Sequence, residues 1–182
     1  MKKAASIFLC SDITPPDVQK LALWLQNRHV TRYLNEDTDV VANLHGLLST
    51  VSPPMLRYHF NQYGRFFLVR TQTDDPIGFV KLRQLSLPQE YEIVFVIGDE
   101  TLWGNGYGVE AVAAAQRQVF LEWRARKLVA KIYHGNARSE AVVQRCGFQA
   151  EQETETLSYF SISAERYLEL QMQQSKAKIS GI

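Results

Sequence analysis

The chain has 182 residues, of which 46% are hydrophobic and 21% charged, and this balance is typical of one folded globular domain. Its formal net charge of +1 excludes a general electrostatic attraction to nucleic acid or to an anionic membrane. Two cysteines, Cys10 and Cys146, are too few for a disulfide framework, and neither has metal-ligand spacing. We expect a single cytoplasmic domain over residues 1–182 with reduced thiols and no metal, and the choice between a monomer and a homodimer stays open.

The first third of the chain is predicted to be mainly helical after one short strand. Thr14 can cap a helix whose first turn holds two prolines, and Asp17 suits the positive end of the same helix. A break is expected at Pro53 and Pro54. The expected elements are a strand over 5–10 and helices over 14–27, 37–51 and 55–62.

The remainder alternates strand signals with three helical stretches. A turn rich in Asp and Pro over 72–76 joins two strand-like runs and predicts an antiparallel hairpin. The expected strands cover 65–71, 77–87, 90–98, 127–134, 148–153 and 156–162, and the helices cover 106–123, 137–146 and 164–182, the last fraying from about 172. This order predicts an α+β fold with a mixed, mostly antiparallel central sheet flanked by helices.

Three glycines, Gly104, Gly106 and Gly108, lie where a predicted strand passes into a predicted helix. Glycine allows a ligand to approach the backbone, and the first N–H groups of a helix bind anions. The stretch lacks the Gly-Lys-Ser/Thr of a P-loop, and Val109 breaks a dinucleotide-binding fingerprint. The turn is therefore a candidate phosphate site of another kind, or a turn in which the glycines serve only the backbone.

Two motifs carry a resemblance to a known family. The stretch "VIGDETLWGNGYGVEA", residues 96–111, resembles the acetyl-CoA loop of the GNAT N-acetyltransferases. The stretch "NARSEAVVQRCGF", residues 136–148, resembles a second segment of the same family, and residues 21–34 resemble its first helix and loop. The likeness extends over residues 5–170 or so, and it is nearest to the ribosomal-protein N-terminal acetyltransferases of the RimJ/RimL-like branch.

The resemblance implies acetyl-CoA as the cofactor and assigns residues to it. It places the pyrophosphate on backbone amides of the glycine loop, pantetheine along the end of a strand, and the thioester in a slot between splayed fourth and fifth strands. The implied cofactor-binding residues are Phe95, Val96, Ile97, Trp103, Gly104, Asn105, Gly106, Tyr107, Gly108, Val109, Asn136 and Ser139.

Acetyl transfer to an amine requires a base, and Glu92 is the best candidate. It interrupts an apolar strand, and the branch that the chain resembles often has Glu there. Partial burial makes a carboxylate a stronger base near neutral pH. The alternatives are a solvated glutamate at that position and, less favoured, His134 as the base.

The sequence indicates the general acid less clearly than the base. Many relatives carry a tyrosine where this chain has Val143. Ser139 is the substitute that we favour, Tyr159 is a weaker one, and solvent protonation of the thiolate needs no acid at all.

The acceptor stays open between a protein N-terminus, an amino sugar or aminoglycoside, and a small amine. An aromatic and basic cluster of Arg57, Tyr58, Tyr63 and Arg65 is interpreted either as an acceptor-binding surface or as a solvated face. Two rival interpretations are a non-catalytic acyl-CoA-binding module and an interaction protein without a ligand.

Overall fold

A computed structural model describes residues 6–34 and 39–180. Within these ranges the strands are β1 (Ile7–Cys10), β2 (Arg65–Thr71), β3 (Pro76–Gln84), β4 (Glu90–Ile97), β5 (Lys127–Tyr133), β6 (Gln149–Glu153) and β7 (Leu157–Ser163). The helices are α1 (Pro15–Gln26), α2 (Arg28–Thr31), α3 (Val40–Thr50), α4 (Leu56–Phe60), α5 (Tyr107–Arg117), α6 (Ala137–Arg145) and α7 (Ala164–Ser180). Short helical turns are η1 (Pro53–Met55), η2 (Glu100–Leu102) and η3 (Gln118–Glu122).

This order of elements confirms the α+β class predicted from the sequence. The strands form one mixed sheet in the order β1-β2-β3-β4-β5-β7-β6. The β1–β2, β2–β3, β5–β7 and β6–β7 pairs are antiparallel, whereas β4 and β5 run parallel, with Glu90 opposite Lys127 and Glu92 opposite Val129. The splayed strand ends that the resemblance implies lie beyond these registered pairs and stay a prediction.

The chain divides into two compact units, and strand β4 and helix α5 each contribute residues to both. The first unit holds residues 1–83 and 94–111, and the second holds 84–93 and 112–182. The interpretation of residues 1–182 as one domain stays a prediction. The predicted elements that reach into residues 1–5, 35–38 and 181–182 lie partly outside the described residues.

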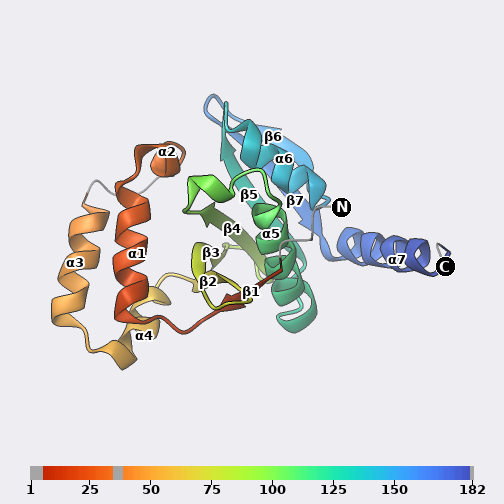
Figure 1. Cartoon of the computed structure of the whole chain (residues 1–182). Coiled ribbons are helices and arrows are strands. Elements are labelled where there is room, and N and C mark those ends of the chain that lie inside the picture. Colours follow the sequence, from red (N-terminus) through yellow and green to blue (C-terminus); the bar gives the residue numbers. More distant parts are fainter. Residues whose placement is uncertain (1–5, 35–38, 181–182) are drawn as a thin grey trace. The chain divides into compact units, whose positions relative to one another are not determined.

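The first unit has an apolar core between its helices and its strands. Helices α1 and α3 lie side by side (Figure 1). Leu21 of α1, Leu47 of α3 and Leu56 of α4 are almost fully buried in a cluster with residues of β2 and β3. Helix α2 was not predicted; the Asn27 side chain accepts a hydrogen bond from the backbone N–H of His29 and caps this single turn.

One buried ion pair joins the start of α1 to strand β2. Asp17 accepts hydrogen bonds from the backbone N–H of Thr14 at 2.8 Å and from Nη2 of Arg70 at 2.8 and 2.9 Å. The Asp17 and Arg70 side chains are only 5% and 9% exposed. Arg70 Nη1 also donates to the backbone carbonyl of Asp74 at 2.7 Å, in the turn between β2 and β3. The predicted hairpin and the first helix are therefore held together by charge as well as by apolar packing.

The second unit packs its helices on β5 and β7. Phe120 stacks on Tyr167 of α7 with ring centroids 4.9 Å apart, and burial raises the pKa of Tyr167. The helix predicted over 106–123 is α-helical only to Arg117 and ends in the π-helical turn η3, in which Trp123 N–H donates to the Gln118 carbonyl. The wider turn accompanies the packing of Trp123 on Tyr91, which the residue periodicity does not encode.

Helix α7 continues to Ser180, beyond the point from which fraying was expected. Residues 171–177 of this helix are all exposed. The earlier turns carry the packing, because Tyr167 is buried and Leu170 lies against Gly147 at the end of α6.

Candidate functional site

In the first unit, the end of β4 packs closely against helix α1. Gly98 N–H donates to the Ile77 carbonyl on β3 at 2.9 Å, and a Cβ on Gly98 would lie 2.1 Å from the ring of Trp24. A side chain at position 98 would therefore displace a tryptophan that is only 6% exposed. Gly98 directly follows β4, but nothing else in its sequence context indicates this close approach to Trp24.

The segment between β4 and the glycine turn is a short helical turn with its own cap. Asp99 accepts hydrogen bonds from the Thr101 hydroxyl at 2.6 Å and from the Thr101 backbone N–H at 2.9 Å, and both hold the pKa of Asp99 below its usual range. Trp103 then turns back, and its indole N–H donates to the Ile97 carbonyl at 2.7 Å. The indole packs against the core of the first unit, so Trp103 anchors the loop.

The glycine turn has the geometry that an anion site requires. Gly104 and Gly106 have φ of +76° and +91°, a region that residues with side chains rarely adopt, and the space where their Cβ atoms would lie is open for 4 Å. Helix α5 begins at Tyr107, and its first intrahelical bond runs from Glu110 N–H to the Gly106 carbonyl. Tyr107 and Gly108 are the first two residues of α5, where helix geometry supplies no intrahelical acceptor for the backbone N–H. The loop therefore fits a phosphate group.

A polar cluster ties this loop to the junction of α1 and α2. Glu100 accepts from Nδ2 of Asn27 and lies 3.0 Å from Nδ1 of His29. The His29 side chain is 76% exposed, so the pair is close to solvent. The sequence places these residues about 70 positions apart, and nothing in their spacing indicates the contact.

The candidate base Glu92 lies in the second unit beside a lysine. Its carboxylate oxygen Oε2 is 3.0 Å from Nζ of Lys131 on β5, and its side chain is 12% exposed. Burial was expected to make Glu92 a stronger base, but an ammonium at this distance favours the charged carboxylate. Lys131 was not predicted as a site residue, because it is one of two lysines in a largely apolar strand and no motif includes it.

Asn136 and Ser139 lie together at the start of helix α6. The Asn136 side-chain oxygen accepts from the backbone N–H of Ser139 at 3.3 Å, so Asn136 caps this helix. Val143, at the position where many relatives have tyrosine, is fully buried and offers no proton. A capping role for Asn136 leaves its predicted cofactor contact untested.

The predicted residues are thus gathered locally in each unit. The first unit brings Phe95–Ile97 and the loop 103–109 together, and the second holds Glu92, Asn136 and Ser139. In the described ranges, 6–34 and 39–180, no group of three or more His, Cys, Asp or Glu side chains is placed to hold a metal ion. None of the helices in those ranges combines the length and apolarity needed to cross a bilayer.

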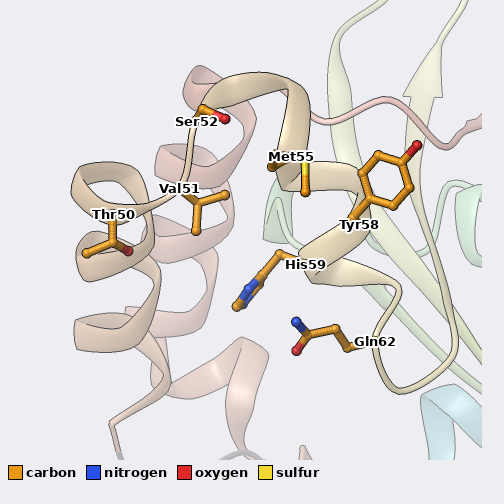
Figure 2. A pocket seen from close by; sticks show the side chains of 7 residues that line it. All are labelled: Thr50, Val51, Ser52, Met55, Tyr58, His59 and Gln62. Atoms are coloured by element: carbon orange, nitrogen blue, oxygen red, sulfur yellow. The ribbon is translucent and has the colours of Figure 1, made fainter.

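A surface pocket lies apart from the glycine loop, where α3, η1 and α4 meet. Figure 2 shows the side chains that line it. Its lining residues are Thr50, Val51, Ser52, Met55, Tyr58, His59 and Gln62. The predicted aromatic and basic cluster is largely exposed, since Tyr58 and Tyr63 show 69% and 77% of their surface, and Arg57 lies 3.5 Å from Asp12.

Solved structures similar to this one share its fold. An acetyltransferase of the GNAT family from Bacillus anthracis superposes with a TM-score of 0.73 at 17% identity, covering 90% of this chain and 98% of that one. Spermidine N-acetyltransferase from Vibrio cholerae, in complex with CoA and spermine, gives 0.73 at 18% identity, covering 89% and 98%. An aminoglycoside acetyltransferase in complex with coenzyme A and kanamycin gives 0.72 at 17%, covering 90% and 98%.

Comparison with curated protein sequences finds no match. The model of one protein family, described as the acetyltransferase (GNAT) domain, matches residues 10–149. That range includes β4, the glycine turn and the cap of α6. The chain therefore belongs to the GNAT acetyltransferase family.

Proposed function

We propose that the protein is an acetyl-CoA-dependent N-acetyltransferase that transfers acetyl directly to a primary amine in a ternary complex. The family match carries this proposal, and the open turn at Gly104 and Gly106 ahead of α5 supports it. Two similar structures were solved with coenzyme A and an amine. We place the protein in the RimJ/RimL-like branch on its motifs; a cytoplasmic location and the oligomeric state stay predictions.

The glycine loop is proposed to bind the pyrophosphate of acetyl-CoA. The backbone N–H groups of Tyr107 and Gly108 lie at the positive end of helix α5 and bind negative charge without a lysine. The main chain of Phe95, Val96 and Ile97 is proposed to bind pantetheine. The Ile97 carbonyl also accepts the hydrogen bond of the Trp103 indole, which joins this strand end to the glycine loop. Bound acetyl-CoA supplies an acetyl group activated as a thioester.

Glu92 is proposed to take the proton of the acceptor amine. Near pH 7 roughly a tenth of an α-amine is neutral, but well under a thousandth of a lysine side chain. This difference corresponds to about 3 kcal/mol of activation free energy. The α-amine of a protein or amino acid can therefore react with the help of a weaker base than a lysine side chain can. A backbone N–H is proposed to polarise the carbonyl. Ser139, at the third position of α6, is the proposed acid, with Tyr159 or solvent as alternatives.

Isothermal titration with acetyl-CoA, followed by detection of free thiol with a panel of amines, tests this proposal. The panel contains peptide N-termini, aminoglycosides, polyamines and amino acids. We expect binding and turnover with at least one class. Binding without turnover on any amine would instead indicate an acyl-CoA-binding module, which the buried Val143 favours. An absence of binding would remove the cofactor assignment.

Gly106→Val is expected to weaken acetyl-CoA binding by at least about 100-fold. The new side chain enters open space ahead of α5 and blocks two or more charge-assisted hydrogen bonds, each of which contributes about 1.5–3 kcal/mol. The φ of +91° also strains a branched residue by roughly 1–2 kcal/mol, so a modest loss of stability accompanies the effect. Calorimetry measures the dissociation constant.

Gly46→Val is the matched control. Gly46 also has open space around its Cβ position, but it lies within α3 and has no positive φ. Its variant should bind acetyl-CoA as the wild type does. Retained affinity in Gly106→Val would show that the turn does not hold the cofactor.

A further inference from the structure

Three strands of the second unit bring Glu92, Lys131 and Tyr159 to one face of the sheet. Glu92 of β4 is registered with Val129 of β5, and Lys131 lies two residues further along β5, on the same face as Val129. Tyr159 of β7 is directly opposite Lys131. The pairing of the strands alone therefore places a carboxylate, an ammonium and a phenol on one face of the sheet.

The contacts on this face place the Lys131 side chain between those of Glu92 and Tyr159. Lys131 Nζ is 3.0 Å from Glu92 Oε2 and 5.8 Å from the centroid of the Tyr159 ring. The Lys131 side chain is 29% exposed and that of Glu92 only 12%. A carboxylate withdrawn this far from water needs a partner charge, and a nearby ammonium favours its ionised form.

We infer that Lys131 is a positioning residue for the proposed base, because it keeps Glu92 ionised and holds its carboxylate in one orientation. This inference rests on the proposed function. An amine proton passes to the Glu92 carboxylate and from there to water, and Lys131 takes no part in the transfer. The neighbouring charged side chains on this face are Glu90 of β4, two residues before Glu92, and Lys127 of β5, which is paired with Glu151 of β6. Tyr159 adds a phenol on the other side of Lys131.

Lys127 provides a matched control on the same strand. It lies four residues before Lys131, on the same face, and its side chain is 28% exposed. It also forms an ion pair with a glutamate, and it holds the pKa of Glu151 below its usual range. A general effect of removing a half-buried lysine from β5 would therefore be seen equally in both variants.

The first measurement is the pH dependence of kcat/KM for Lys131→Met, Lys131→Arg and Lys127→Met. In Lys131→Met the acid limb should move to higher pH, because loss of the cation makes Glu92 bind a proton more readily. Activity near pH 7 should fall about tenfold or more, and it should approach that of the wild type at high pH. Lys131→Arg should retain the wild-type profile, as should Lys127→Met. A uniform loss at all pH values in Lys131→Met would overturn the inference.

The second measurement does not depend on turnover. Carbon-13 NMR of glutamate-labelled protein follows the Glu92 carboxyl signal, which is assigned by its loss in Glu92→Gln. Its titration midpoint should rise in Lys131→Met and stay unchanged in Lys127→Met, in which the Glu151 signal should move instead. An unchanged Glu92 titration midpoint in Lys131→Met would show that Lys131 does not keep Glu92 ionised. Wild-type protein that acetylates no amine refutes the proposed function, and the NMR result is unaffected.

Discussion

Glu92→Gln is expected to lower kcat/KM near pH 7 by about 10²–10⁴-fold, the usual contribution of a general base. Glutamine preserves the shape of the side chain but cannot accept the amine proton. The loss should diminish as the pH rises past the amine's own pKa, because the acceptor is then already neutral. The affinity for acetyl-CoA should change by less than about twofold, since the proposed phosphate site lies on other residues.

Rate profiles between pH 6 and 10 and calorimetric titration with acetyl-CoA check this prediction. Glu90→Gln is the matched control, because Glu90 lies two residues earlier on β4 and faces the same side. Its profile should equal that of the wild type. A thermal melt is also needed, because Gln at position 92 leaves the Lys131 ammonium without its anion. An unchanged profile in a folded Glu92→Gln variant would exclude Glu92 as the base.

Asp17→Ala is expected to lower the free energy of unfolding by about 3–5 kcal/mol, which is the usual result of breaking a buried ion pair on one side. Arg70 would keep its charge while 9% exposed, and Thr14 would lose an acceptor at the start of α1. Arg70 Nε has no hydrogen-bond partner among the described residues, so this guanidinium depends on Asp17, on the Asp74 carbonyl and on the exposed Asp74 carboxylate 3.6 Å away. Urea unfolding measures the effect.

Two further variants separate this pair from ordinary surface charge. Asp17→Ala combined with Arg70→Met should recover much of the lost stability, because no unpaired charge then stays buried. Glu169→Ala removes one partner of an exposed pair, Arg166 and Glu169, at 3.5 Å and should cost less than about 1 kcal/mol. A loss below 1 kcal/mol for Asp17→Ala would show that the pair adds little to the first unit.

Local sequence signals, each of which spans only a few residues, determined the order of the elements. A turn rich in Asp and Pro between two strand-like runs marked the hairpin of β2 and β3. Thr14 and Asp17 marked the start of α1, and the glycines marked the turn before α5. Backbone preference and capping are local, so a single sequence carries them. The one-turn helix α2 and the π-helical turn η3 escaped prediction because each is stabilised by one specific contact.

The sequence by itself determined the family, the α+β class and the loop proposed for acetyl-CoA, because its motifs use the backbone freedom of glycine and the exposed N–H groups of a helix start. Only the tertiary structure decided which side chains meet across the strands. The pairing of Glu92 with Lys131 depends on strand register, and the packing of Trp24 on Gly98 and of Asp17 on Arg70 joins residues more than 50 positions apart. Such contacts leave no periodic trace along the chain, since they arise from how the elements pack.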